Sequence, residues 1–487
     1  MAVSVSFQLL LGSTFWVLLA KTLSLGMRAL IMPVLARLLT PEDFGIVGTS
    51  IAILMLFAVV STNGMPAALV ARGPTRRDDP AIWSTVFWAQ LATAAVLTGV
   101  IVVLAKPLAT LLDTPRAAPV LVALSGVFVL MCLNACLRAE LFKTMRFRNQ
   151  AVVEVVAHLI GATAAIVAAF AGFGLWALVV LYYTTTSLNG LGLLVITRFR
   201  PSWRFEGRRL LAFLPFALRT VFSDLCMWIS TRSPLLAVAN FDGITAAGAW
   251  TASQQFVRLP NRIIARSIMD VLFPAFSSLK GDHQRLAAGF RASTHAAVLV
   301  QTPLLFGLWA VAEPAMVVIF GQNWGWAWPI LGLLALATGL NAPSLSIVSF
   351  LKGIDRTDRL LQLSVLQAFF VSVAAVVGAT LDGATGAALA VAVTRGIYNP
   401  IALVYTLRLA ELPPLTNLLV MLRPMFAAAV MAVTVRHVLE DWVPLAWSPL
   451  SSLVVGVTLG ALIYTALVFA VDGEGRQLVK RLLRRRR

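Results

Sequence analysis

The sequence predicts an all-α polytopic membrane protein, with about 14 transmembrane helices in two pseudo-symmetric lobes around a central cavity. Three observations support this fold class. The 487 residues are 59% hydrophobic and only 12% charged, with a mean hydropathy of +0.87, which no soluble domain of this length approaches. The apolar runs are continuous over about 20 residues and do not alternate as barrel strands do. Lys and Arg residues gather in short patches between these runs.

The net charge of +18 does not indicate a nucleic-acid-binding protein, because the charge is distributed as in the cytoplasmic loops of membrane proteins. The basic C-terminal residues, Lys480 to Arg487, are typical of anchoring to anionic lipid headgroups. We therefore expect membrane lipids as partners and no nucleic acid. The first ten residues have no basic region and no small-residue cleavage site, so we expect no removable signal peptide.

Fourteen apolar runs are long enough to span a bilayer, and twelve is the alternative count. Short polar loops separate them and leave no room for a separate globular domain. The expected spans are residues 14–36, 44–70, 81–105, 118–137, 151–171, 175–196, 210–231, 246–268, 292–312, 328–351, 360–380, 387–407, 418–438 and 449–471.

The distribution of the 39 Lys and Arg residues predicts that both termini are cytoplasmic. With even-to-odd connections on the cytoplasmic side, 31 of these residues fall there, four fall outside and four lie within spans. Cytoplasmic loops carry an excess of Lys and Arg, so this bias indicates an even number of spans. Arg395, Arg408 and Arg423 are among the residues counted on the cytoplasmic side.

The first span contains two cations, Lys21 and Arg28, well inside its ends. Each costs about 2.5–3.5 kcal/mol at the centre of a spanning helix. They are seven residues apart, so they share one face and lie about 10 Å apart along the axis. This stripe indicates a wet cavity that holds an anion. The alternative is that both side chains snorkel to the interface.

The seventh span contains Arg219, Asp224 and Arg232 among several Ser and Thr residues. Asp224 is the one carboxylate that we place deep in the membrane. It lies on a different face from Arg219, so we expect its partner on another helix, with Lys21 or Arg28 as candidates. The pair is either a buried ion pair that joins the two lobes or part of a substrate site, and the two roles are compatible.

A basic stripe follows the eighth span, where Arg258 begins a series of arginines four residues apart. It is interpreted as a face for lipid headgroups or as a cytoplasmic funnel that admits the substrate. We include Arg258 among the candidate substrate-binding residues, with Lys21, Arg28, Arg219, Asp224 and Arg232. Cys132, Cys136 and Cys226 are interpreted as core residues, so we expect no metal site and no cofactor.

Two local signals concern helix ends. Thr40-Pro41-Glu42-Asp43 combines a capping hydroxyl, an early Pro and two acids, which predicts that a new helix starts at Phe44. Asn341 and Asn399 each lie next to or near a Pro within a span. They either bond backbone groups that the Pro frees or line the cleft.

An internal echo favours a two-fold arrangement. Pro33-Val-Leu-Ala leads to a helix-starting Gly45, and Pro234-Leu-Leu-Ala leads to Gly248. The two spacings differ by two residues. The echo pairs spans one and two with spans seven and eight, as in a repeat transporter, and predicts lobes at residues 1–209 and 210–487.

The segment from Arg28 to Gly48, RALIMPVLARLLTPEDFGIVG, resembles the opening of bacterial polysaccharide flippases of the Wzx type. It is most similar to the branch that includes the colanic acid exporter, in the multidrug/oligosaccharidyl-lipid/polysaccharide exporter superfamily. The MATE-like, fourteen-span, two-lobe plan covers the whole chain, although the second half matches only in layout. The resemblance implies a flippase in the bacterial inner membrane that moves undecaprenyl-diphosphate-linked oligosaccharide repeat units by alternating access, for exopolysaccharide, O-antigen or capsule assembly.

Three other functions stay open at this point: a peptidoglycan-precursor flippase, a drug or cation exporter of the same superfamily, and a membrane glycan polymerase. The outer loops are short and their acidic residues are scattered, which argues against an enzyme. The sequence contains no GxxxxGK[ST] motif, so we do not expect this chain to hydrolyse ATP. A cavity with four cations and one deep acid argues for an anionic cargo, held by Arg and Lys at its phosphates. The resemblance implies a polyprenyl-diphosphate-linked glycan as the partner, together with other polysaccharide-assembly proteins.

Overall fold

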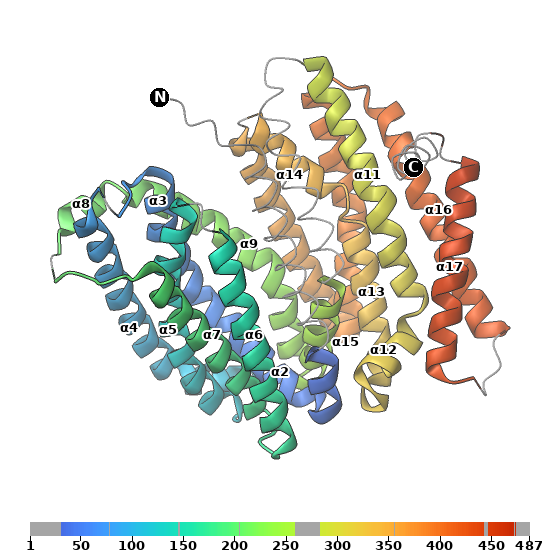
Figure 1. Cartoon of the computed structure of the whole chain (residues 1–487). Coiled ribbons are helices and arrows are strands. Elements are labelled where there is room, and N and C mark those ends of the chain that lie inside the picture. The colour runs from blue at the N-terminus through green and yellow to red at the C-terminus, as the bar shows by residue number, and fades with distance from the viewer. Residues whose placement is uncertain are drawn as a thin grey trace. The chain divides into compact units, whose positions relative to one another are not determined.

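The computed structural model describes residues 31–76, 78–144, 147–203, 205–258, 283–354, 356–442, 447–471 and 473, in which every regular element is helical. The chain forms two compact units, divided between Gly248 and Ala249. In Figure 1 the first unit is blue to green and the second is mainly yellow to red. The all-helical fold class is confirmed. The functional division at residue 209 stays a prediction.

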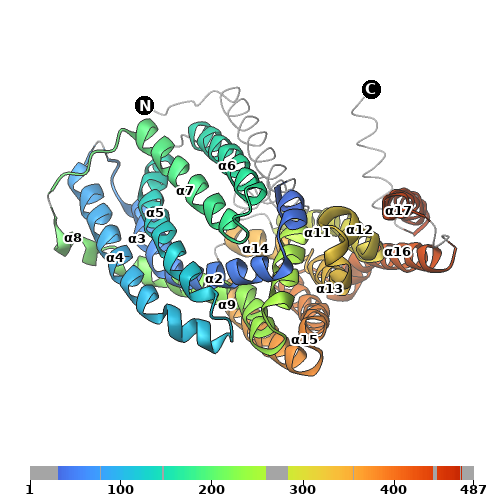
Figure 2. The ribbon, with the colours of Figure 1, turned by 90° about the horizontal axis from the view of Figure 1, so that it is seen from below.

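The first unit is a bundle in which α4 packs on α5, α5 on α7, and α7 on α6 (Figure 2). α2 packs on α5 and on α9. Its elements are α2 (Pro41–Ala58), the π-helix η1 (Val59–Asn63), α3 (Gly64–Arg72), α4 (Pro80–Leu111), α5 (Ala117–Lys143), α6 (Phe147–Phe170), α7 (Trp176–Thr197), α8 (Gly207–Leu211) and α9 (Leu214–Phe241).

The second unit has α11 between α16 and α13, with α15 against α13 and α17 against α16. α12 bends away from α11 by 81°. The elements are α11 (His283–Ala310), α12 (Ala312–Phe320), the 3-10 helix η2 (Gln322–Ala327), α13 (Trp328–Gly339), α14 (Ser344–Gly353), α15 (Thr357–Leu409), α16 (Pro414–Asp441) and α17 (Pro449–Val471).

Within the described residues, eight helices are long and apolar enough to cross a membrane, or nine if α11 and α12 form one span. The chain is therefore a multi-pass membrane protein. α15 is one of these eight helices, but Asp382 and Gly383 have non-helical φ and ψ and divide it into two segments. The two segments correspond to the eleventh and twelfth predicted spans. The total of fourteen stays a prediction.

Two predicted boundaries need correction. The tenth predicted span, 328–351, is broken, because α13 ends at Gly339 and α14 begins at Ser344. The seventh, 210–231, is displaced toward the C-terminus: α9 runs through Pro234 to Phe241 and ends before Gly243, whose φ is +89°. Neighbouring helices satisfy the backbone groups that Pro frees in a membrane, so Pro234 does not end α9.

The capping signal before α2 is confirmed. The Thr40 side chain accepts a hydrogen bond from the backbone N–H of Asp43, and the Asp43 carboxylate accepts one from the backbone N–H of Thr40. This reciprocal pair is a capping box. α2 therefore starts at Pro41, three residues earlier than the predicted start at Phe44.

Three loops that were predicted to be cytoplasmic meet at one end of the first unit. Arg76 forms an ion pair with Glu140 at 3.0 Å and donates a hydrogen bond to the Thr197 carbonyl at 2.7 Å. Lys143 donates to the Val70 carbonyl at 2.9 Å. These contacts join the loops that follow α3, α5 and α7, as the charge distribution requires of loops on one side of the membrane.

The segment between α7 and α9 is fastened to the start of α4. Arg209 on α8 forms ion pairs with Asp79, the N-cap of α4, and with Glu206 at 2.7 Å. The hydrogen bond from Arg209 holds the pKa of the Asp79 carboxyl below its ordinary value. Trp203 stacks on Trp88 with ring centroids 4.7 Å apart. The start of α9 is thereby fixed relative to α4.

The start of α2 crosses residues 244–248, which are helical, at a pair of glycines. A Cβ atom on Gly45 would overlap the carbonyl oxygen of Ile244, and one on Gly248 would overlap that of Pro41. The contact is reciprocal: each glycine faces the carbonyl group of the residue that lies four positions before the other glycine. This reciprocal contact joins the two positions that the sequence echo pairs, and it explains why both are Gly.

Replacing Gly45 with Val will lower thermal stability, because the side chain has no room beside the Ile244 carbonyl. Overpacking costs about 1–3 kcal/mol or more, which corresponds to a fall in melting temperature of roughly 5 °C or more. The measurement is thermal unfolding of the protein purified in detergent. Gly99→Val on α4 is the matched control, because a Cβ there meets nothing within 4 Å. Equal melting temperatures for the two variants would refute the close crossing.

Candidate functional site

The candidate site residues fall in three places. Lys21 and Arg28 lie outside the described residues. Arg219, Asp224 and Arg232 are on α9 in the first unit. Arg258 is half-buried in the helical residues 244–258, in the part that belongs to the second unit, and it has interaction partners there. The clustering of all six residues stays a prediction.

α9 is unusual among the long helices because it is not apolar enough to be counted as a span on composition alone. Arg219, Asp224 and Arg232, with several Ser and Thr residues, reduce its hydropathy. At about 1.5 Å per residue its 28 residues extend about 42 Å, which exceeds the thickness of a bilayer core. A helix of this length with a polar composition needs partners or water along its polar positions.

The corrected bounds of α9 change the depth of its charged residues. Asp224 and Arg232 lie about 5 and 7 Å from the middle of the helix along its axis. Arg219 lies about 13 Å from the middle, near the edge of a core that is about 30 Å thick. Arg232, which the predicted span placed at its end, is thus as deep as Asp224.

The packing of α9 on α2 and α3 separates the three charged residues by face. Val221 and Ala217 face the Gly64 backbone, and the Trp228 indole donates a hydrogen bond to the Ala52 carbonyl at 3.0 Å. At 100° per residue these three define one face. The remaining positions on the helical wheel follow from the same rotation: Asp224 and Arg232 lie about 40° from the centre of that face, and Arg219 lies about 180° from it.

The surroundings of the three residues differ accordingly. Arg219 is exposed, and no carboxylate in the described part of the chain lies within 4 Å of it. Arg232 is half-buried, with the Tyr182 hydroxyl of α7 as an electrostatic neighbour. Asp224 is half-buried and has an interaction partner. Arg219 and Asp224 do not form an intrahelical pair, as the sequence analysis expected.

Several buried polar groups of the first unit were missed by the sequence analysis. The Ser61 hydroxyl, in η1, lies 2.7 Å from the thiol of Cys132, and the Gln90 amide donates to the Ser61 carbonyl. The Asn134 amide donates to the Thr186 carbonyl at 2.9 Å. A π-helix often marks a functional position, and here it brings a free carbonyl to Gln90. The sequence signal that could have revealed these buried hydrogen bonds is the presence of single Gln and Asn residues within apolar runs.

One arginine of the second unit was assigned wrongly. The charge account placed Arg395 on the cytoplasmic side, but the residue lies inside the second segment of α15, which covers residues 384–409. Eleven residues separate it from the start of this segment and 14 from its end. It is therefore an intramembrane cation. The remaining bias of Lys and Arg toward the cytoplasmic side is still strong.

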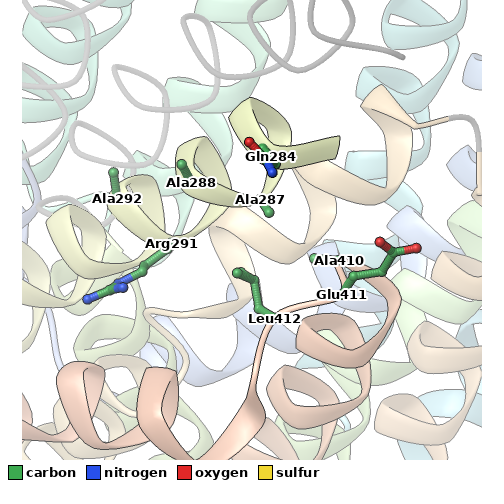
Figure 3. A pocket seen from close by; sticks show the side chains of 8 residues that line it. All are labelled: Gln284, Ala287, Ala288, Arg291, Ala292, Ala410, Glu411 and Leu412. Atoms are coloured by element: carbon green, nitrogen blue, oxygen red, sulfur yellow. The ribbon is translucent and has the colours of Figure 1, made fainter. Parts of the chain in front are cut away.

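Among the residues that the structure describes, no group of three or more His, Cys, Asp or Glu side chains is placed to hold a metal ion. A cavity of about 500 Å³ lies in the second unit, between the start of α11 and the loop from α15 to α16. Figure 3 shows its two charged residues, Arg291 and Glu411, extending in opposite directions. Four alanines form much of the wall, and no candidate site residue lines it.

Comparison with known proteins identifies relatives over nearly the whole chain. A family model described as "Polysaccharide biosynthesis protein" matches residues 34–329. The succinoglycan biosynthesis transport protein ExoT of Rhizobium meliloti (strain 1021) is 33% identical over 472 residues, which are 96% of this chain and 94% of that protein. The lipopolysaccharide biosynthesis protein WzxC of Escherichia coli (strain K12) is 24% identical over 91% of this chain and 86% of its own length.

Solved structures of the same fold include two kinds of transporter. The lipid II flippase MurJ, in an inward closed conformation, matches with a TM-score of 0.76 and 15% identity, over 93% of this chain and 98% of that chain. An inward-facing multidrug resistance MATE family transporter of the MOP superfamily matches with a TM-score of 0.63 and 14% identity, over 80% and 95% of the two chains. At this identity the likeness establishes the fold alone.

If Asp224 pairs with a cation of the first span, replacing it with Asn will destabilise the protein, because that cation then stays in the membrane without a counter-charge. Loss of one partner of a buried pair costs about 3–5 kcal/mol. Combining Asp224→Asn with Arg28→Gln or with Lys21→Gln will recover part of the loss for the true partner, with a coupling of about 0.5–3 kcal/mol. The measurement is thermal unfolding of single and double variants. Additive effects with both Lys21 and Arg28 would exclude pairing to the first span.

Proposed function

This chain belongs to the polysaccharide biosynthesis and export proteins of the Wzx/ExoT type, and from this membership we propose that it is a flippase for a lipid-linked oligosaccharide repeat unit. The family consists of polysaccharide biosynthesis transport proteins and not of enzymes, so the glycan polymerase alternative is set aside. We propose undecaprenyl diphosphate as the lipid carrier and the bacterial inner membrane as the location. The observation that carries the proposal is the 33% identity to a succinoglycan biosynthesis transport protein over 96% of the chain.

The interior charges support an anionic cargo. Arg219, Arg232 and Arg395 lie within helices of the described chain, where Asp224 is the one comparably deep acid on α9. A guanidinium group presents a planar set of donors that matches phosphate oxygens in pairs. A diphosphate group is the part of the proposed substrate that every repeat unit shares. Arg219, exposed on the face of α9 opposite α2 and α3, is the described residue best placed to bind it.

A drug or cation exporter is the less favoured function. A cation is attracted by an acidic cavity, whereas the arginines outnumber the single deep acid on α9. A peptidoglycan-precursor flippase would use the same type of lipid diphosphate, so the interior charges do not distinguish it from the proposed function. The two functions differ in the glycan that is exported.

Alternating access is the proposed mechanism, and the repeat supports it. The reciprocal crossing of Gly45 and Gly248 joins the starts of two helices that occupy matching positions in the sequence echo. Transporters built from repeats move one repeat against the other around a central site. The atoms nearest the two glycines are backbone atoms, so no side chain interlocks at this point and the helices are able to separate there as they tilt.

The three basic loops that meet at one end of the first unit support a cytoplasmic location for that end. In the second unit, Arg436 near the end of α16 lies over the rings of Trp309 and Trp328, 4.9 Å from each centroid. It also forms an ion pair with Glu440 at 2.7 Å. Trp residues of this kind are typical of a membrane–water interface. We propose that the end of α16 that carries Arg436 is periplasmic and that both termini are cytoplasmic.

Arg219→Ala will reduce export at least about tenfold, the effect of losing one charge-assisted phosphate contact of about 1.4 kcal/mol or more. The measurement, in a strain that lacks the chromosomal copy, is polymer output together with the amount of lipid-linked repeat unit on the cytoplasmic face. Arg219→Lys will retain part of the activity. Arg138→Ala, at the exposed basic end of α5, is the control for loss of a positive charge.

Normal polymer output from Arg219→Ala at normal protein level would reject the role of this residue. The proposed substrate would be rejected if the protein complemented deletion of a peptidoglycan-precursor flippase and exported no polysaccharide. The peptidoglycan precursor would then be the substrate.

A further inference from the structure

The break between α13 and α14 lies in the middle of a predicted span and exposes backbone groups where water is scarce. α13 covers 12 residues and α14 covers 10, so each is about half of a spanning helix. Residues 340–343 between them form a turn. In a membrane every backbone N–H and C=O group needs a partner within the protein. The partners of the end of α13 can be identified one by one.

Two carbonyl groups at the end of α13 have lost their usual helical partners. The N–H of Asn341, which would bond the Ala337 carbonyl in a continuous helix, bonds the Thr338 carbonyl at 3.2 Å. The N–H of Ser344, which would bond the Leu340 carbonyl, bonds the Asn341 carbonyl at 3.1 Å. Both freed carbonyls therefore depend on side chains.

Those side chains come from one face of α15. Arg395 donates a hydrogen bond from Nη1 to the Ala337 carbonyl at 3.4 Å. Asn399, one turn further along, donates from its amide to the Leu340 carbonyl at 3.0 Å. Asn399 thus bonds backbone that the break leaves free, although the break and not its neighbour Pro400 frees this carbonyl.

The turn itself is tied to α15 by a second set of bonds. The Ser344 hydroxyl lies 3.0 Å from the amide oxygen of Asn399 and 3.1 Å from that of Asn341. The Gln367 amide, on the first segment of α15, lies 3.3 Å from the same Asn341 oxygen. Asn399 is only 1% exposed. The break is therefore a built polar site and not a frayed helix end.

Arg395 is the one charged group among these contacts. It lies about 17 Å from one end of its helical segment and about 21 Å from the other, so it is close to the middle of the membrane. Within the described residues no carboxylate lies within 4 Å of it, and its Nε atom is buried without a hydrogen-bond partner. The negative charge that it meets is the C-terminal end of α13, where the helix dipole concentrates about half an elementary charge.

Unwound carbonyls and the C-terminal ends of half-helices are the groups with which membrane transporters coordinate small cations. Here the end of α13 offers such carbonyls, and the guanidinium group of Arg395 occupies one of them, that of Ala337. We propose that the α13–α14 break is a monovalent-cation site that the chain fills from within, with Arg395 in place of a dissolved ion. The proposal goes beyond the proposed function, because it concerns the resident cation and not the cargo.

A direct consequence is that removing the Arg395 side chain creates a binding site for a free cation. Guanidinium is the closest replacement for the lost group, and Na⁺ and K⁺ are smaller alternatives that carbonyl oxygens accept. The intact protein, with its site filled, will not respond to these ions. The effect needs no substrate, so its failure is distinguishable from failure of the proposed flippase function.

The test is thermal unfolding of purified Arg395→Ala, with choline replaced by guanidinium, Na⁺ or K⁺ at millimolar concentration and constant ionic strength. We expect at least one of these ions to raise the melting temperature of the variant by several degrees and to leave the intact protein unchanged. Arg408→Ala is the matched control, because it removes an exposed cation from the same helix. Arg395→Lys, which keeps a tethered charge, will also be unresponsive.

An Arg395→Ala protein that is as stable as the intact protein in choline, or that gains nothing from any of the three ions, overturns the proposal. An equal response from Arg408→Ala also overturns it. If Arg395→Ala fails to fold, purification is repeated with each ion present throughout. Recovery of folded protein with an ion but not with choline supports the proposal, and no recovery with any ion overturns it.

Discussion

A charge within a lipid bilayer needs a counter-charge, a set of dipoles or water, and this requirement governs the positions of the polar residues in this protein. Arg395 meets the carbonyl end of a broken helix. Asp224 and Arg232 flank the face on which α9 packs against α2 and α3. Arg219 has no such partner among the described residues and lies on the opposite face. Water or an anionic ligand is what remains to satisfy it.

The same requirement explains why the least regular helices carry the functional groups. α9 is not apolar enough to be a span by composition, and α13 and α14 are each too short to be one, whereas α4, α5 and α17 are both long and apolar enough. A transporter needs some interior surface that a polar cargo can wet, and an apolar helix cannot supply it. The regular helices provide a support whose basic loops are joined by Arg76, Lys143 and Arg209.

Sequence patterns predicted the elements that depend on local chemistry. The capping box at Thr40 and Asp43, the continuous apolar runs such as the 23 residues of α17, and the grouping of the basic loops all follow from neighbouring residues. The break in α13–α14 and the length of α9 were missed because both depend on other helices. The helix breaks between α13 and α14 where Arg395 and Asn399 donate hydrogen bonds to the freed carbonyls, whereas α9 continues through Pro234. Arg395 was misplaced for the same reason, since its partner is a backbone group that no side-chain pattern reveals.

The central claim is that Arg28 and Arg219, the cations proposed to meet the cargo, face water and not lipid, and cysteine labelling tests it most directly. In a variant without Cys132, Cys136 and Cys226, single cysteines replace Arg28, Arg219 or, as a lipid-facing control, Val103, which is 74% exposed on α4. Membrane vesicles receive a charged, membrane-impermeant maleimide on both sides. The account predicts labelling at positions 28 and 219 and none at 103. Labelling of none of the three, with all three reacting only with a lipid-soluble maleimide, would contradict it.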